Sequence, residues 1–415
     1  MLTLAEARSR SARSLVCLLL ALGVAAAVDA QIPEPDLSAN ARVHLGPVAM
    51  TPGIVCSAGY DTNPYGDPVP VETYEFYATP QVEGWIGRAA NRASFWGAVE
   101  LIAFTDLVGA RNWQAGGEYR RVGSRIRPFV RYNAKHTNAN PTGYEVGRKS
   151  MRIEGDFFGG VLVTPGARFT LGGSFRSTVT RWDADAIYQG SDLRQSLNRR
   201  SNAVRGSVGF PVTPLTSLEF GAEATTDRFV YSPERDGNGA RVDVGIALAS
   251  PAVIRGSAVL GYRHFHSLTS SAGDFDGFVG HATLGYARGS GGYLGGVFVR
   301  DMDFSYDESL SYYVSTSFEV TAMQTLSTRW RLQGFATVAW LDYRASTNAQ
   351  GNDQRAAGVG GAVGYNLRPR TVIGASIDWT NVVGSRAWNG LRTVAFLTYG
   401  SDNFQRLDRP VPFSR

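Results

Sequence analysis

The sequence predicts an all-β protein, a transmembrane antiparallel up-and-down β-barrel. Three observations lead to this prediction: apolar and polar residues alternate along one segment after another, very short turns join these segments in pairs, and a secretion signal precedes them. Residues 241–248 illustrate the alternation, with Val242, Val244 and Ile246 set against Arg241 and Asp243. A strand face that carries both signs of charge suits a barrel with lipid outside and water inside better than it suits a sandwich core.

Residues 1–30 have the features of a Sec-type signal peptide. Arg8, Arg10 and Arg13 precede an apolar run at residues 15–28, and the residues around Ala30 predict cleavage after that position or a few residues earlier. No later segment is apolar for long enough to form a membrane helix. We therefore expect a periplasmic lead-in at 31–50, a barrel at 51–400 and a C-terminal tail at 401–415. The expected mature chain holds one cysteine, Cys56, which excludes an internal disulfide.

Short turns separate the predicted strands at a regular spacing. The first strand is expected at about residues 53–60, and a tight turn, two strands, a longer polar loop and two more strands then repeat. The tight turns are rich in Pro, Gly, Ser and Arg, as hairpin turns are. They are expected at residues 87–92, 121–124, 164–167, 213–216, 250–252, 288–292, 324–328 and 367–370.

The remaining connections are longer and more polar. They are expected at residues 61–71, 136–149, 182–199, 231–238, 268–274, 305–310, 345–354 and 382–388. Short connections at one rim and long ones at the other are typical of outer-membrane barrels, whose long loops face outward. The turns predict about 18 strands, with 16 the nearest alternative, and an even number places both ends of the barrel in the periplasm. A propeller is the weaker alternative because each repeat holds two long strands, not four short ones.

The register of the predicted strands is well specified. Val99 and Leu101 fall on the apolar face and Glu100 on the polar face, so a slip of one residue would turn a charge toward lipid. Aromatic residues gather at the strand ends and predict two belts at the membrane interfaces, although aromatic residues favour strands in any case. The belt beside the tight turns would hold Trp85, Phe95, Phe169, Tyr293 and Trp330, and the belt near the long loops Tyr60, Trp113, Trp340 and Trp379.

Charged residues on the polar faces form the candidate functional set. Lining a water-filled lumen, such residues would determine which solutes pass. Alternatively, each charge pairs with one on a neighbouring strand and only braces the wall, which is the expected role of a single residue taken alone. The set expected to face the lumen and contact solute is Arg127, Arg131, Arg152, Arg241, Arg255, Arg263, Arg331, Glu100, Glu154, Asp156, Glu219, Glu223, Asp243, Glu319 and Asp378.

Other polar motifs give no positive sign of a metal site, a cofactor or catalysis. His264 and His266 share a strand face but lack a visible third ligand, so they are expected at the lipid-facing outer end of a strand. Two acidic loops, one with Asp61, Asn63 and Asp67 and the other with Asp274 and Asp276, lack the spacing of a calcium loop, and turn formation explains them as well. No serine elbow or catalytic triad is present. We therefore expect a protein that is not an enzyme and binds no cofactor.

Several segments resemble the outer-membrane β-barrel porins associated with exopolysaccharide gene clusters. The resemblance covers most of the expected mature chain, and its motifs are strand and turn patterns rather than a reactive site. The segments that carry it are 59–63, 78–80, 214–218, 255–257, 261–263, 276–278, 312–316 and 341–344.

The resemblance implies a porin-like conduit that serves the export of an anionic or neutral extracellular polysaccharide across the Gram-negative outer membrane. The expected partners are outer-membrane lipid, lipopolysaccharide and periplasmic export components, and no nucleic acid. Such barrels usually end on an aromatic residue, whereas Tyr399 is followed here by the tail, so the assembly signal is internal or the last strand lies elsewhere. A non-conducting docking barrel and a general diffusion porin remain alternatives, and an outer-membrane hydrolase is a weaker one.

Overall fold

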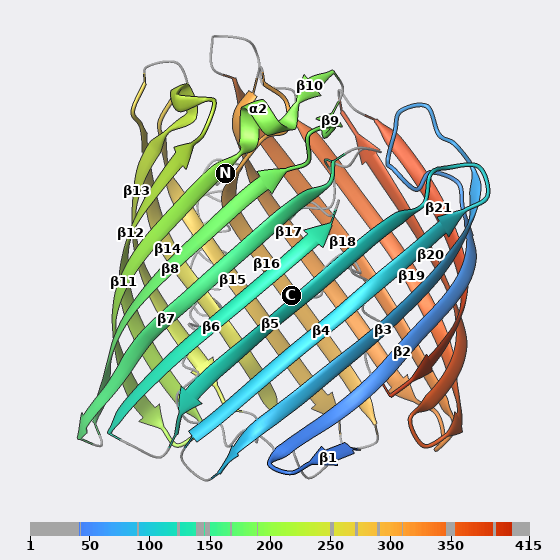
Figure 1. Ribbon diagram of the computed structural model, residues 1–415. Coiled ribbons are helices and arrows are strands. Elements are labelled where there is room, and N and C mark those ends of the chain that lie inside the picture. Colours follow the sequence, from blue (N-terminus) through green and yellow to red (C-terminus); the bar gives the residue numbers. More distant parts are fainter. Residues whose placement is uncertain are drawn as a thin grey trace, which may run out of the picture.

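The chain folds into a closed barrel of tilted antiparallel strands, seen in a computed structural model (Figure 1). The structure describes residues 41, 43–88, 91–122, 125–137, 145, 150–166, 168–188, 190–249, 253–269, 273–288, 291–308, 310–345, 353–384 and 387–400. The expected signal peptide and the tail at 401–415 lie outside these residues. None of the described helices is long and apolar enough to cross a membrane.

Eighteen strands form the wall, which confirms the predicted number and rules out 16 strands and a propeller. Each strand pairs with the next along the chain, and β2 pairs with β21 from Ile54↔Tyr399 to Asp61↔Arg392 to close the barrel. The closure also shows that the last strand ends where it was expected. The wall strands are β2 (Val48–Asp61), β3 (Thr73–Arg88), β4 (Asn91–Phe104), β5 (Ala110–Arg121), β6 (Ile126–Thr137), β7 (Arg152–Gly166), β8 (Phe169–Trp182), β11 (Arg199–Thr213), β12 (Thr216–Phe229), β13 (Gly237–Leu248), β14 (Ile254–Ser267), β15 (Phe275–Arg288), β16 (Gly292–Phe304), β17 (Leu310–Thr325), β18 (Trp330–Ala345), β19 (Gln354–Arg368), β20 (Thr371–Val383) and β21 (Trp388–Tyr399).

The alternating pattern sets which side of each strand faces out. Val242 is 60% exposed and Phe278 is 63% exposed, although both lie in the middle of long ladders. Large apolar side chains at alternate positions on the outer wall are what lipid requires. Glu100, by contrast, lies between the exposed Val99 and Leu101 and is itself fully buried. The outer face is therefore apolar and the inner face polar.

The two rims differ as the sequence predicts. Seven of the eight expected tight turns include described residues and connect strands at the lower rim of Figure 1, and the longer connections lie at the upper rim. The turn expected at 250–252 lies outside the described residues. Short elements occur in the long connections: β9 (Ile187–Tyr188), β10 (Ser191–Asp192), helix α2 (Leu193–Leu197) and the 3-10 turn η2 (Pro233–Arg235).

Two details of the sequence-based prediction are wrong. Strand β2 begins at Val48, about five residues earlier than expected, and a short strand β1 (Val43–Leu45) pairs with its start, so part of the expected lead-in belongs to the sheet. Trp85 and Tyr293 also do not belong to the outer aromatic belt. Each lies next to an exposed apolar residue, Ile86 or Leu294, and so points to the inner side of the wall.

Candidate functional site: the lumen and its mouth

The candidate site is the inner wall together with the loops that fold over it. Strand alternation places all fifteen charged residues of the predicted set on the inner face, because their sequence neighbours carry the outward apolar side chains. Whether these residues contact a solute remains a prediction. Most of them, however, contact other polar side chains of the protein.

The strongest pairing joins strands β11, β12 and β13. Both guanidinium nitrogens of Arg205 donate to Asp243, at 2.6 and 2.7 Å, and one also donates to Glu219 at 3.1 Å. Arg241 Nε lies 3.2 Å from Asp243, whose side chain is fully buried. The two arginines offset the desolvation free energy of the buried carboxylate, and removing either one would leave part of that cost uncompensated. This network braces the wall, as the bracing alternative predicts.

Other inward charges are paired in the same way. Across the closing seam Arg392 binds Glu75 and lies 3.7 Å from Asp378. Lys135 and Arg152 both contact Glu154, and Arg176 contacts Asp156. Glu100 accepts a hydrogen bond from Asn112, also fully buried. For these residues, pairing within the wall is enough to explain an inward charge, and contact with a solute is not needed.

Three inward arginines have no carboxylate partner among the described residues: Arg131, Arg255 and Arg331. The guanidinium of Arg131 lies 5.5 Å from the ring centre of Trp96, and that of Arg255 lies 5.8 Å from the ring centre of Tyr293. Such cation–π contacts leave the guanidinium donors available to a ligand. These three arginines are therefore the best candidates within the predicted set for contact with a solute.

The mouth at the long-loop rim is narrowed by one hairpin. We call residues 301–308 and 310–314, the end of the β16–β17 hairpin, the hairpin tip. The ladder between β15 and β16 stops at Gly280↔Arg300, so the backbone of β16 beyond Arg300 leaves the sheet on that side. Its Tyr306 reaches Arg152 on β7, and six strands (β8, β11, β12, β13, β14 and β15) separate β7 from β16 around the wall. The tip thus crosses the lumen.

Apolar side chains hold the tip against the inner wall. Phe304 packs edge-on against Phe229, with ring centres 4.9 Å apart, and Tyr306 packs edge-on against Trp182 at 4.8 Å. Helix α2 contributes Leu193, which is fully buried. The complete cluster is Trp182, Ala186, Tyr188, Leu193, Leu197, Phe229, Phe265, Phe275, Val279, Met302, Phe304, Tyr306, Tyr312 and Val314. The loop at 183–198 therefore contributes to the obstruction.

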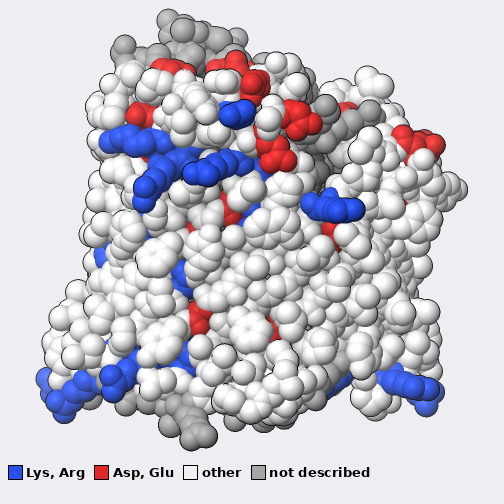
Figure 2. Space-filling view, viewed as in Figure 1, with Lys and Arg blue, Asp and Glu red and all other residues white. Residues whose placement is uncertain are grey.

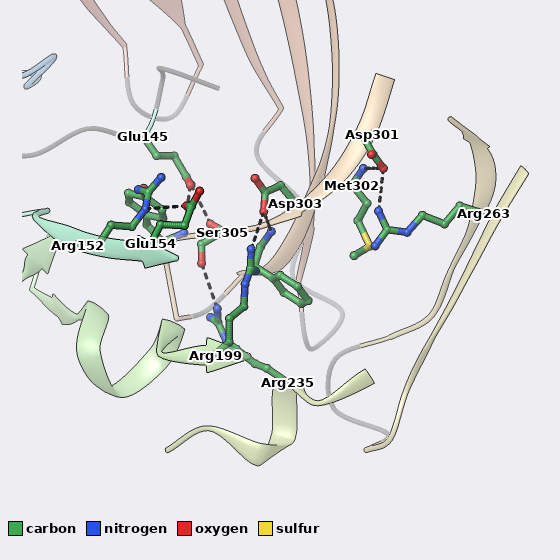
Figure 3. Close-up of polar contacts among 12 residues, drawn as sticks. Glu145, Arg152, Glu154, Arg199, Arg235, Arg263, Asp301, Met302, Asp303 and Ser305 are labelled. Carbon is green, nitrogen blue, oxygen red and sulfur yellow. Dashed lines mark hydrogen bonds and ion pairs between the residues drawn. The ribbon is translucent and has the colours of Figure 1, made fainter. Parts of the chain in front are cut away.

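Polar contacts anchor the tip from two further connections and from strand β11 (Figure 3). Arg235 of η2 donates to the backbone oxygens of Ser305 and Asp307, at 3.1 and 3.0 Å. Glu145 accepts from the Ser305 hydroxyl at 2.9 Å and from the Tyr306 backbone N–H at 3.1 Å. On β11, Arg199 lies 3.5 Å from Asp303. These groups fix the tip in one position.

Burial affects the ionisable groups in these connections. It raises the pKa of Tyr306 well above its ordinary value, so the phenol stays neutral and donates or accepts as a hydroxyl. It lowers the pKa of Arg235, because the guanidinium loses water, although nearby glutamates including Glu234 oppose that shift. An arginine with a lowered pKa is still charged at neutral pH. Both groups keep the form that their contacts need.

Two hollows lie among the described residues. A pocket of about 30 Å³ lies against the tip, between Arg152, Trp182, Arg199 and Phe304, and has room for about one water molecule. A hollow of about 770 Å³ is lined by Tyr74, Phe76 and other outward residues, so it faces lipid and not the lumen. The tip is therefore closely packed where it meets β7, β8 and β11.

The other predicted polar motifs have structural partners. His264 contacts Asp276 at 2.8 Å and His266 contacts Asp274 at 3.1 Å, all on the outer side of the β14–β15 hairpin near the long-loop rim. Asp61 and Asn63 accept hydrogen bonds from backbone N–H groups within their own loop. The described residues include no group of three or more His, Cys, Asp or Glu side chains that could hold a metal ion.

Sequence reasoning missed two kinds of residue. Arg205 and Arg392 lie on inward positions of alternating strands, so the pattern that identified their neighbours could have found them. Glu145, Arg235 and Tyr306 lie in connections, where alternation carries no information about direction. Only the folded chain shows that they meet.

Comparison with known proteins identifies the family. Residues 168–390 match the model of the family described as Putative beta-barrel porin 2. The chain belongs to this family of porins. It is therefore an outer-membrane β-barrel, and the long loops are expected at the cell surface. No curated protein sequence matches the chain.

Solved porin structures are similar to the chain at low identity. The structure of Pseudomonas aeruginosa OccK2 (OpdF) in complex with glucuronate is 8% identical, with a TM-score of 0.47 over 84% of this chain and 98% of that chain. Pseudomonas aeruginosa OccK3 (OpdO) is 11% identical, with a TM-score of 0.44 over 84% and 95%. A BenF-like porin from Pseudomonas fluorescens is 11% identical, with a TM-score of 0.45 over 84% and 98%.

Proposed function

We propose that this porin is a conduit for an extracellular polysaccharide, with the hairpin tip narrowing its outer mouth. The observation that supports a conduit is the inner wall itself, which carries both signs of charge inside a closed barrel. The polysaccharide rests on the resemblance of the strand and turn segments to porins of exopolysaccharide gene clusters. Periplasmic export components would then deliver the polymer to the short-turn rim.

Arg131, Arg255 and Arg331 are the proposed contacts for acidic groups of the sugar. An arginine that already binds a carboxylate must break that pair before it binds a solute, whereas these three need not. Trp96 and Tyr293 lie beside two of them, so a sugar face could stack where its carboxylate is bound. A neutral polymer would use the stacking surfaces alone.

The hairpin tip favours a second candidate, a channel for small solutes. A polymer that crosses the mouth must displace a tip held by Arg235, Glu145 and a buried aromatic cluster, whereas a small solute needs a narrower opening. A third candidate is a barrel that docks secretion components without conducting. The three candidate functions predict different results for channel current in a bilayer and for polymer secretion by cells.

Planar-bilayer recording of the purified porin separates a conduit from a docking barrel. We expect a steady single-channel current, and replacing the three arginines by glutamine (R131Q/R255Q/R331Q) should shift the reversal potential in a salt gradient toward cation selectivity. The matched control is R176Q, which removes an inward arginine already paired with Asp156. No current under any condition would count against both channel candidates.

Deletion of the gene separates the two cargoes. Loss of polymer secretion with unchanged uptake of small solutes supports polysaccharide export. Unchanged secretion with reduced uptake supports the small-solute channel and overturns the polysaccharide proposal. Complementation with R131Q/R255Q/R331Q tests the proposed contacts, because the variant should restore assembly of the barrel but not the transport that is lost.

A further inference from the structure

We propose that Arg181, Arg200 and Arg228 form a binding site for the phosphate groups of a phosphorylated glycolipid of the outer leaflet. The three arginines lie on the outer wall near the long-loop rim, and we call them the rim arginines. Figure 2 shows Lys and Arg side chains gathered near the upper left of this face of the molecule. The inference depends on the outward orientation of the long loops, but not on what passes through the lumen.

The pairing of the strands places the rim arginines together. Arg200 on β11 lies directly opposite Arg228 on β12. On its other side Arg200 is opposite Val179, and Arg181 is two residues beyond Val179 on β8. Residues that face each other across two strands have Cβ atoms about 5 Å apart, and like charges at that distance destabilise the sheet. An anion bound between them would reverse this effect.

Alternation shows that the rim arginines point away from the lumen. Arg199, the neighbour of Arg200, turns inward to Asp303, and Trp182, the neighbour of Arg181, packs inside the mouth. Val204, four residues below Arg200 on the same strand face, is 61% exposed to the outside. The rim arginines therefore continue the lipid-facing surface upward rather than the water-filled lumen.

The protein leaves most of this charge unbalanced. Neither Arg181 nor Arg200 has a hydrogen-bond or ion-pair partner within the described part of the chain. Arg228 donates to the backbone oxygens of Asp227 and Gly237 and to the side-chain oxygen of Asn238, each at 2.8 Å, and its Nε lies 3.9 Å from Asp236. The nearby Asp183 pairs with His136. Two arginines with free donors and a third whose charge faces a carboxylate only at 3.9 Å form a cationic site.

The wall below the rim arginines explains why the ligand is a lipid and not a free anion. A band of polar outward side chains comes first, with Ser177 donating to Asn202 at 2.8 Å. Apolar outward residues follow, including Phe175 and Val204. A strand rises about 3.3 Å per residue, so the four positions from Arg200 to Val204 span about 13 Å along the strand. Phosphates above and acyl chains below match this order of surfaces.

Arginine suits phosphate because its planar donors form two parallel hydrogen bonds to the phosphate oxygens. The phosphorylated glycolipid anchor of lipopolysaccharide, lipid A, presents phosphates at the level of the headgroups and acyl chains beneath them. An arginine on a lipid-facing strand near the interface costs little, whereas the same residue at the middle of the bilayer costs about 2–4 kcal/mol. Near the rim, an arginine that faces lipid therefore costs little free energy and lies at the level of the lipid A phosphates.

Binding of lipid A to the purified full-length porin in detergent tests the proposal. The variant R181Q/R200Q leaves in place Arg228, which also supports the β12–β13 connection. We expect its affinity for lipid A with intact phosphates to fall at least tenfold, and lipid A stripped of phosphate to bind wild type and variant equally weakly. The matched control is R120Q/R176Q, which removes the same charge from the inner wall, where Arg120 pairs with Glu118 and Arg176 with Asp156, and should leave the affinity unchanged.

Three outcomes would overturn the proposal. One is equal affinity of wild type and R181Q/R200Q for lipid A, and a second is equal affinity of wild type for intact and dephosphorylated lipid A. The third is binding of inorganic phosphate as tight as that of lipid A, which would show an anion site without a lipid. Heat-modified migration on gels checks that every variant is folded. The variant R181K/R200K keeps both positive charges and should therefore retain part of the affinity for lipid A.

Discussion

Removing the Arg235 side chain should release the hairpin tip and make the mouth open more often. Arg235 is almost completely buried, and its guanidinium donates at 3.1 Å to the Ser305 oxygen and at 3.0 Å to the Asp307 oxygen. A hydrogen bond that involves a charged group stabilises by about 1.5–3 kcal/mol, so these two bonds contribute about 3–6 kcal/mol. Part of this is offset, because the variant no longer buries a charge.

A net loss of about 1.5–3 kcal/mol raises the ratio of open to closed tip about tenfold to a hundredfold, since 1.4 kcal/mol corresponds to a factor of ten. Single-channel recording of R235A should show this as more frequent openings to a larger conductance. The control is R194A, which removes an exposed arginine from helix α2 in the neighbouring connection. Gating of R235A that matches wild type would refute the inference that Arg235 anchors the tip.

Three further predictions concern the wall, the aromatic cluster and the rim. R205A leaves the fully buried Asp243 with a single arginine and should lower the free energy of unfolding in urea by about 3–5 kcal/mol. The double variant R205A/D243A should recover part of that loss. An equal loss in the double variant would argue against the pair. L193A removes a fully buried side chain of α2 and should destabilise the loop by about 2–5 kcal/mol, seen as faster proteolysis at 183–198, with R194A again the control. The pKa of Asp274 is lowered, first because His266 donates a hydrogen bond to it, so the stabilisation is present above the ordinary aspartate pKa of about 4 and is lost as pH falls through the lowered value. In H266A the carboxyl resonance of Asp274 should titrate at higher pH than in wild type, and an unchanged midpoint would mean that the Ser267 backbone N–H alone causes the shift.

The fold was predictable because local sequence patterns specify the strands and turns of a membrane barrel. Each strand needs an apolar face for lipid and a polar face for the lumen, and this requirement acts on every second residue, as at Val99, Glu100 and Leu101. Turn residues mark the strand ends, so the strand number and both rims follow from the sequence. The early start of β2 at Val48 was missed because Pro47 and Pro52 weaken the pattern there.

The inward direction of the charged set was predictable for the same reason, but its pairing was not. Alternation shows that Arg241 and Asp243 face the lumen, yet it does not show that Arg205, two strands away, also binds Asp243. Pairing depends on the relative stagger of the strands and on which side chains reach across an intervening strand. The stagger is a property of the closed sheet, and it decides which arginines are occupied and which stay available.

The sequence by itself determined the barrel, its eighteen strands, the polar inner wall and the distinction between the two rims, because these depend on contacts with solvent and lipid that each strand makes locally. Only the tertiary structure decided that the mouth is crossed by the hairpin tip. Tyr306, Glu145, Arg235 and Trp182 come from four separate connections or strand ends and meet only when the barrel closes and brings them into one space. Their packing depends on side chains distant in sequence, which no local periodicity encodes.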